Sequence, residues 1–415
     1  MAKILKTWTT LGVALLGTAS IADGAALTKA PAAANPTFIL SDGEGGEGGE
    51  GGGDIVTTYA LGSTDAKAYA YDAKPQVSAY ATLVHESYAG AKAAADQMAS
   101  AIDALLDTPS PDALAAARKA WVAARPAYLQ TEAFRFYDGP IEAIEGDINA
   151  WPMNEAYIDY VVGKMDSGLV NDGTSPLTAG ALQSVNQKSD EADVTTGWHA
   201  IEFLLWGQDL SEDGPGNRPH TDYIAGKDNN DRRRTYLKAV TEKLVGDMQS
   251  LEQAWAPGVA GNYRETFEKL EQREALGRIV NGMAILAGFE FMSERLGVAL
   301  DSGDQEDEHS CFSDTTKQDF VGDLEGIKRV WTLAKLNELV ESRDPSLAAQ
   351  VDGLLADTEA KIAALGDPWD KVLWADPASP ERQAAEASVA SLQALADGLK
   401  KVGNNLGLLV LIPTG

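Results

Sequence analysis

A histidine and a glutamate stand three residues apart in the almost wholly apolar stretch 197–207. This spacing places His199 and Glu202 on one face of a helix, one turn apart. A helix that is apolar over the rest of its circumference is buried. A carboxylate held there needs a partner, because an unpaired buried charge is costly. A metal ion, an arginine or a bound ligand would each serve.

A second set of residues that could bind a ligand or do chemistry follows the 4-3-4-3 spacing of a helix face. These residues are Trp121, Arg125, Tyr128, Glu132 and Arg135. A core face would carry Leu or Ala, so aromatics interleaved with charges favour the wall of a polar site. A solvated face is the alternative. Pro126 lies inside the predicted helix, which runs from Asp112 to about Tyr137, and predicts a kink.

A third polar group is the run 305–314, which interrupts an otherwise helical pattern. Imidazole with carboxylates suits iron or zinc. The metal interpretation joins these predicted ligands: His199, Glu202, Glu132, Glu306 and Asp307, with Asp314 and Glu290 as weaker candidates. The other interpretation is a buried His–Glu hydrogen bond without a metal. The residues alone leave both open.

A metal-dependent peptidase is less well supported by these residues. A zinc protease of the His-Glu-x-x-His type needs two helical histidines, and His85-Glu86 is followed by Ala89. Cys311 is two residues from His309, which is poor evidence for a catalytic pair, and a small packed residue is the plainer interpretation.

The composition limits the elements that position these groups. The 415 residues include 62 acids and 34 bases, a formal charge of −28. This charge argues against nucleic acid and anionic membranes as partners. Helical periodicity throughout predicts an all-α fold. The expected helices are 77–106, 112–137, 154–162, a helix around His199, 232–255, 263–300, 323–343, 345–365 and 379–402.

The N-terminal residues have the pattern of an export signal. Lys3 and Lys6 precede a short apolar run and small residues, so residues 1–26 are predicted to be a signal peptide; a buried helix start is the alternative. Residues 27–75, rich in Ala/Pro and then Gly/Glu, are predicted to be a disordered linker. Two helical bundles are expected, at 76–230 and 231–415. Residues 288–297 faintly echo 197–207, which suggests two related halves without demonstrating a repeat.

Several stretches together resemble the imelysin family, also called peptidase M75, in its iron-regulated protein A branch. The matching stretches are 120–121 with 131–140, 148–152 with 155–161, 197–209, 232–237 and 306–314. Their order and spacing, and their Trp and Cys positions, make the match specific. The family signature Gly-x-His-x-x-Glu falls on Gly197, His199 and Glu202.

The resemblance implies an exported protein of bacterial iron acquisition with two helical-bundle domains. It would bind a metal ion or chelated iron in a cleft between them, iron being the first choice of metal and zinc the second; a peptidase is the alternative. A periplasmic or secreted location is expected, with an outer-membrane or periplasmic transport component as a further partner and no transmembrane segment in the mature chain. The residues predicted to line the cleft beside the metal ligands are Arg125, Tyr128, Arg135, Trp198, Ser310 and Asp314.

Overall fold

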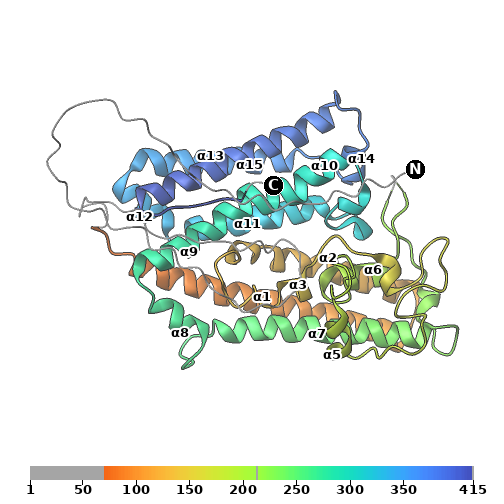
Figure 1. Cartoon of the computed structure of the whole chain (residues 1–415). Helices are drawn as coiled ribbons and strands as arrows, with labels where there is room; N and C mark the ends of the chain where they lie inside the picture. The colour runs from red at the N-terminus through yellow and green to blue at the C-terminus, as the bar shows by residue number, and fades with distance from the viewer. Residues whose placement is uncertain (1–69, 212–213, 414–415) are drawn as a thin grey trace, which may run out of the picture. The chain divides into compact units, whose positions relative to one another are not determined.

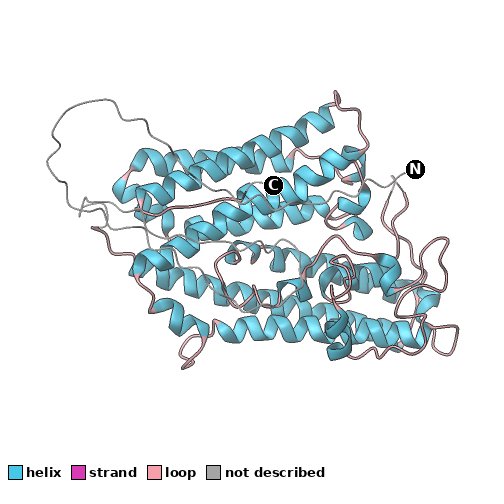
Figure 2. Ribbon diagram, viewed as in Figure 1, coloured by secondary structure: helices cyan, strands magenta, loops and turns pink. Residues whose placement is uncertain are grey.

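A computed structural model describes residues 70–211 and 214–413, and this part of the chain is built of helices with no strand (Figure 2). The predicted all-α class is confirmed. The predicted signal peptide and nearly all of the predicted linker lie outside the described residues.

The longer helices are α1 (Lys74–Asp107), α2 (Pro111–Leu129), α6 (Gly197–Trp206), α7 (Asn230–Ala254), α9 (Gln272–Ile285), α11 (Thr316–Leu333), α12 (Leu336–Arg343), α13 (Pro345–Ala363) and α15 (Pro380–Asn405). The shorter ones are α3 (Glu145–Ile148), α4 (Glu155–Ile158), α5 (Ala179–Val185), α8 (Tyr263–Glu268), α10 (Val298–Ser302) and α14 (Asp370–Leu373). Turns of 3₁₀ helix are η2 (Glu132–Phe134), η3 (His220–Tyr223), η5 (Gln305–Asp307) and η6 (Cys311–Ser313), and η4 (Leu286–Gly297) is a π-helix.

The first part of the chain packs around α1. Helices α1 and α2 form a hairpin, and α7 lies along α1 (Figure 1). Helix α2 begins where the sequence indicates, because the Ser110 hydroxyl accepts a hydrogen bond from the Ala113 N–H and Pro111 occupies the first turn. The domain boundary predicted between residues 230 and 231 stays a prediction.

Helix α2 ends earlier than predicted. It stops at Leu129, and the chain continues as a 3₁₀ turn before Arg135. The Thr131 hydroxyl donates to the Tyr128 carbonyl at 2.6 Å, which competes with the next backbone hydrogen bond of the helix. Glu132 and Arg135 therefore leave the helical stripe that the sequence predicts.

The second part packs around a continuous helical rod, Gln272–Ser302, made of α9, η4 and α10. Helix α15 packs on α13 and on this rod, and Figure 1 shows these helices together. The rod is long and apolar enough to cross a membrane, but 78% of its apolar window is buried within the fold, as in the core helix of a soluble protein. The predicted helix 323–343 is two helices, since Lys335 adopts a left-handed φ of 57°.

Helix α11 joins the two parts by packing against α2. The approach is close: a Cβ on Gly326 would lie 2.6 Å from the Gln130 carbonyl oxygen. Helix α6, whose ten residues are all buried, packs on α2 and α7. The fold thus places α6 and the first turns of α11 on the same side of α2, where the candidate site forms.

Candidate functional site

The glycine of the Gly-x-His-x-x-Glu signature sets the start of α6. Gly197 has a φ of 89°, and a Cβ there would lie 2.3 Å from the Ile148 carbonyl oxygen. No other residue fits both the conformation and the space. The preceding Thr196 donates its hydroxyl to the Asp147 carbonyl at 2.8 Å. The glycine therefore lets α6 begin tightly against the segment that contains α3.

His199 and Glu202 form a direct pair inside α6. Nδ1 of His199 lies 2.9 Å from Oε2 of Glu202, and both side chains are fully buried. Oε1 of Glu202 accepts the Ser313 N–H at 2.9 Å and the Ser313 hydroxyl at 2.6 Å. Both carboxylate oxygens are thus engaged by the protein. Burial raises the pKa of Glu202 to about 8, although the Ser313 donors and the Arg125 charge oppose this.

Arg125 occupies the other side of the imidazole. Its Nη2 lies 3.2 Å from Nε2 of His199 and 3.2 Å from Oδ2 of Asp319. A guanidinium only donates, so Nε2 accepts and the proton of the neutral imidazole belongs on Nδ1, facing Glu202. Burial, and then the Arg125 charge, lower the pKa of His199 well below its usual range, which keeps the ring neutral.

Three aromatic rings hold the Arg125 guanidinium in place. Its central carbon lies 5.8 Å from the ring centre of Trp121, 5.6 Å from that of Tyr128 and 5.8 Å from that of Trp198. These cation–π distances explain why aromatics alternate with the charge along α2. Nη1 of Arg125 also donates to Oδ1 of Asn149 at 2.5 Å.

Asp319 connects this pair to the segment that precedes α11. Its Oδ2 lies 2.7 Å from Nδ1 of His309 and accepts the Ser310 hydroxyl at 2.6 Å. The His309 ring centre is 4.8 Å from that of His199. Serine, histidine and aspartate are thus adjacent, but Ser310 and His309 both bind the carboxylate and not each other. A hydrolytic triad needs the serine bonded to the histidine.

Glu132 belongs to a neighbouring buried ion-pair network. Its Oε2 accepts Arg135 at 2.7 Å and Arg295 at 2.6 Å. Arg295 also donates to Asp323 at 2.8 Å and to Glu290 at 3.0 Å. Burial alone would raise the pKa of Glu132, but the charges of Arg135 and Arg295 outweigh it and hold that pKa below its usual range.

A cavity of about 560 Å³ adjoins both networks. One wall comes from residues 135–152 and the other from the π-helix η4 with its flank. In a π-helix residues five apart lie on nearly the same side, and Arg295 here reaches Glu290 at 3.0 Å. The charged and imidazole side chains that line the cavity are Arg135, Glu142, Glu145, Asp147, Glu290, Glu294, Arg295, Asp307 and His309, and Trp151 lies among them.

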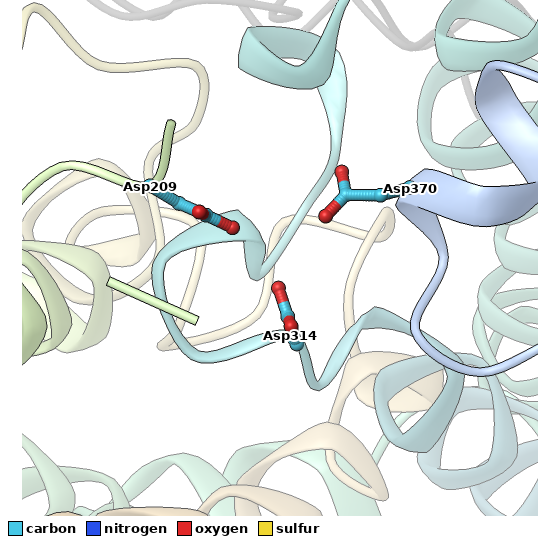
Figure 3. A group of neighbouring side chains, drawn as sticks. All are labelled: Asp209, Asp314 and Asp370. Carbon is cyan, nitrogen blue, oxygen red and sulfur yellow. The ribbon is translucent and has the colours of Figure 1, made fainter. Parts of the chain in front are cut away.

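The structure brings together only some of the predicted site residues. Arg135 and Asp307 line the cavity. The predicted residues that are buried beside it, and do not line it, are His199, Glu202, Glu132, Arg125, Tyr128, Trp198 and Ser310. Glu306 is exposed and lines a separate hollow with Glu155 and Asp209. Asp314 faces Asp209 and Asp370 (Figure 3).

The predicted metal ligands do not form an assembled centre in this structure. Among the described residues, the group of three or more potential ligands within 4.8 Å of one another is Asp209, Asp314 and Asp370, and it lacks His199 and Glu202. Arg125 and Ser313 fill the positions that a metal would need on the His199–Glu202 pair. The pair as it stands does not fit a bound metal ion, and a metal there would have to displace Arg125.

The prediction missed three central residues: Asp319, Asp323 and Arg295. Asp319 and Asp323 are four residues apart on α11, both fully buried. Two acids at that spacing within a run containing Phe320 and Leu324 form the same kind of signal as His199 and Glu202. That signal was available in the sequence.

Comparisons with known proteins point to one family. The family model for imelysin, peptidase M75, matches residues 84–401. The chain is 25% identical over 330 residues to iron-regulated protein A of Synechococcus elongatus, covering 77% of this chain and 82% of the relative.

Two solved structures share the fold. An iron-regulated protein A precursor from Parabacteroides distasonis superposes with a TM-score of 0.65 at 17% identity, over 80% of this chain and 95% of that one. An imelysin-like protein from Psychrobacter arcticum gives a TM-score of 0.55 at 17% identity, over 81% and 94%. Because the family model spans most of the chain, this protein belongs to the imelysin family.

Proposed function

We propose that this protein binds a metal-bearing ligand, with iron as the metal, in the cavity between residues 135–152 and η4. The observation that carries the proposal is the lining of that cavity: six carboxylates and one imidazole face two arginines. This excess of negative charge favours a cationic ligand. A volume of about 560 Å³ suits a small molecule or chelate better than a bare ion.

The choice of iron rests on the relatives and on the donor set. The matched protein of Synechococcus elongatus and the structural neighbour from Parabacteroides distasonis are both designated iron-regulated protein A. Carboxylate and imidazole groups are donors that iron accepts.

His309, not His199, is the imidazole that this proposal assigns to the ligand. His309 lines the cavity and uses Nδ1 to contact Asp319. The carboxylate there favours the proton on Nδ1, so Nε2 keeps its lone pair. Asp307, two residues away, lines the same cavity. Both residues lie in the run 305–314 that the sequence marks out.

A fluorescence titration tests the proposal, because Trp151 lines the cavity. The cationic 1:2 complexes of iron(III) and gallium(III) with maltol, and maltol alone, would be titrated into the full chain. We expect saturable quenching by the ferric complex and a saturable change in tryptophan emission with the gallium complex, both weakened about tenfold or more in Asp307→Asn and His309→Gln. Glu306→Gln is the matched control, since Glu306 neighbours Asp307 but lines a separate hollow outside the cavity. No saturable signal, or equal weakening in the control, would overturn the proposal.

A metal-dependent peptidase is the second candidate, and the M75 designation of the family model favours it. The hydrogen bonds of Ser310 and His309 do not support a serine mechanism. Burial raises the pKa of the Cys311 thiol well above its usual range, which does not support a thiolate nucleophile. Peptide hydrolysis that is sensitive to a chelator and lost in His309→Gln would favour the peptidase.

We also propose that the chain is exported and acts in the periplasm or outside the cell, with a transport component of the envelope as partner. The motivation is the predicted signal peptide at residues 1–26. N-terminal sequencing of the mature protein should begin near residues 25–30, and an intact Met1 in exported material would contradict cleavage.

A further inference from the structure

Three carboxylates outside the cavity converge on one point. Asp209 follows α6, Asp314 follows η6 and Asp370 begins α14. One oxygen from each lies within 4.8 Å of the others, and Figure 3 shows the three side chains pointing toward one another. Segments more than fifty residues apart in the chain thus bring the same functional group to one place.

A fourth carboxylate, Glu308, adjoins this cluster. It is fully buried near the Thr316 hydroxyl and the Asp370 carboxyl, and neither of its oxygens makes a hydrogen bond of good geometry with a described residue. Burial raises the pKa of Glu308 well above its usual range, and the next cause is the charge of Asp370, with that of Asp314 further down. A buried, unpartnered carboxylate beside three others is costly unless a positive charge joins them.

Three of these four carboxylates, those of Asp209, Asp314 and Glu308, have no basic side chain beside them in the described part of the chain. No lysine, arginine or histidine of residues 70–211 or 214–413 lies within 4.0 Å of the carboxylates of Asp209, Asp314 or Glu308. Asp209 accepts hydrogen bonds from two neutral donors, the Ser211 N–H at 3.0 Å and the Gln305 amide at 2.7 Å. Burial and then Asp209 raise the pKa of Asp314 to about 8.

We propose that Asp209, Asp314 and Asp370, with Glu308 beside Asp370, form a binding site for a hard divalent cation of the calcium class. The donors are all carboxylate oxygens, which calcium prefers and thiophilic metals do not. One oxygen of each lies within 4.8 Å of the others, a spacing that a single ion with Ca–O bonds of about 2.4 Å can bridge. This site is separate from the proposed ligand cavity.

Such a cation would fix the segment 308–314, which also serves the His199 site. Ser313, which donates two hydrogen bonds to Glu202, immediately precedes Asp314. Glu308 immediately precedes His309, which contacts Asp319. The same short segment therefore contributes side chains both to the proposed cation site and to the polar network around His199. A bound cation would thus also hold the residues of that network in place.

The test is calcium binding to the full chain by calorimetry, together with terbium luminescence, since Trp369 adjoins Asp370 and would sensitise a lanthanide. We expect one strong site in the wild type and an affinity about tenfold or more weaker in Asp314→Asn and Asp370→Asn. Asp376→Asn, an exposed acid six residues beyond Asp370, is the matched control. Weak binding by the Gly/Glu-rich stretch 41–54 would be common to all variants.

Thermal melts of the wild type with calcium and with a chelator give a second readout that needs no variant. Calcium should raise the melting temperature and the chelator should lower it. The alternative is that the carboxylates share protons and bind no cation. In that case there would be no saturable calcium or terbium binding, and calcium would not change the melting temperature. That result would overturn the proposal. Because no iron is present in these measurements, their outcome is independent of the titration with the ferric complex.

Discussion

Nη2 of Arg125 lies 3.2 Å from Nε2 of His199, on the side of the ring opposite Glu202. The imidazole therefore has a donor on one nitrogen and a carboxylate on the other, and neither nitrogen is left for a metal. In this arrangement the signature histidine and glutamate are part of the buried core beside the cavity, and the proposed function assigns the ligand-facing imidazole to His309.

Removal of Arg125 should create a metal site. In Arg125→Ala the Nε2 lone pair of His199 is released and the repelling charge is gone, so we expect micromolar binding of Zn(II) or Ni(II) that the wild type lacks at that position. The double variant Arg125→Ala/His199→Ala should lose it. Arg125→Lys keeps the positive charge and serves as the control. Calorimetric titration of the four proteins makes the comparison.

The same Arg125→Ala change should lower the free energy of unfolding by about 3–5 kcal/mol, because it leaves the buried Asp319 charge with a weaker set of partners. Urea denaturation measures this. An Arg125→Ala protein that is as stable as wild type and binds no metal would contradict the role assigned to this arginine.

Above about pH 8, where Glu202 is ionised, Glu202→Gln should destabilise the fold even though the shape is kept. The carboxylate receives donors on both oxygens, from His199 and from Ser313. Whichever way a glutamine amide is turned, its NH₂ meets one of those donors. A lost buried hydrogen bond of this kind costs about 1–3 kcal/mol.

Denaturation of Glu202→Gln beside the wild type measures that cost. If Glu202 were instead a metal ligand, the glutamine variant would keep nearly full stability and lose metal binding that the wild type shows. A calorimetric metal titration of both proteins distinguishes the two outcomes.

The sequence predicts the helices around the site better than the site itself. The apolar surroundings of His199 and Glu202 indicate a buried α6, and Ser110-Pro111 indicates the start of α2. Periodicity contains no information about which distant groups meet. The contacts of Glu202 with Ser313, and of Arg125 with Asp319, join residues more than 100 positions apart.

The lining of the cavity could not be predicted from the sequence for a further reason. The pairing of Glu290 with Arg295 depends on the π-helix, which brings residues five apart to nearly the same side. An α-helical pattern places these two residues on different faces. Neighbouring acids also look alike in a sequence. Glu306 and Asp307 are neighbours, yet only Asp307 lines the cavity.

Gly197→Ala should destabilise the protein by about 3 kcal/mol or more, since alanine disfavours a φ of 89° and its Cβ would collide with the Ile148 carbonyl. Gly353→Ala is the matched control. Gly353 lies within α13 with open space around it, so alanine there should stabilise by about 0.5–1 kcal/mol. Thermal or urea unfolding of both variants gives the comparison, and equal effects would contradict the role of Gly197.

Ligand binding in the cavity should strengthen as the pH rises from about 6 to 8. Burial raises the pKa of Glu145 to about 7, although Arg135, 3.1 Å away, opposes this. A cationic ligand favours the ionised form, so binding releases the proton that Glu145 holds below its pKa, and affinity rises by up to about tenfold per pH unit there. Above pH 8 the group is already ionised and the dependence should level off.

Glu145→Gln cannot ionise, so its affinity for the cationic gallium–maltol complex should be lower than that of the wild type at pH 8 and should hardly change between pH 6 and 8. Gallium avoids changes in iron oxidation state, and maltol alone corrects for the ligand's own titration. Glu306→Gln should keep the wild-type slope, because Glu306 lies outside the cavity. A wild-type slope of the opposite sign would mean that the cavity prefers an anionic ligand. An unchanged slope in Glu145→Gln would assign the proton to another group, such as Glu142, whose pKa burial also raises.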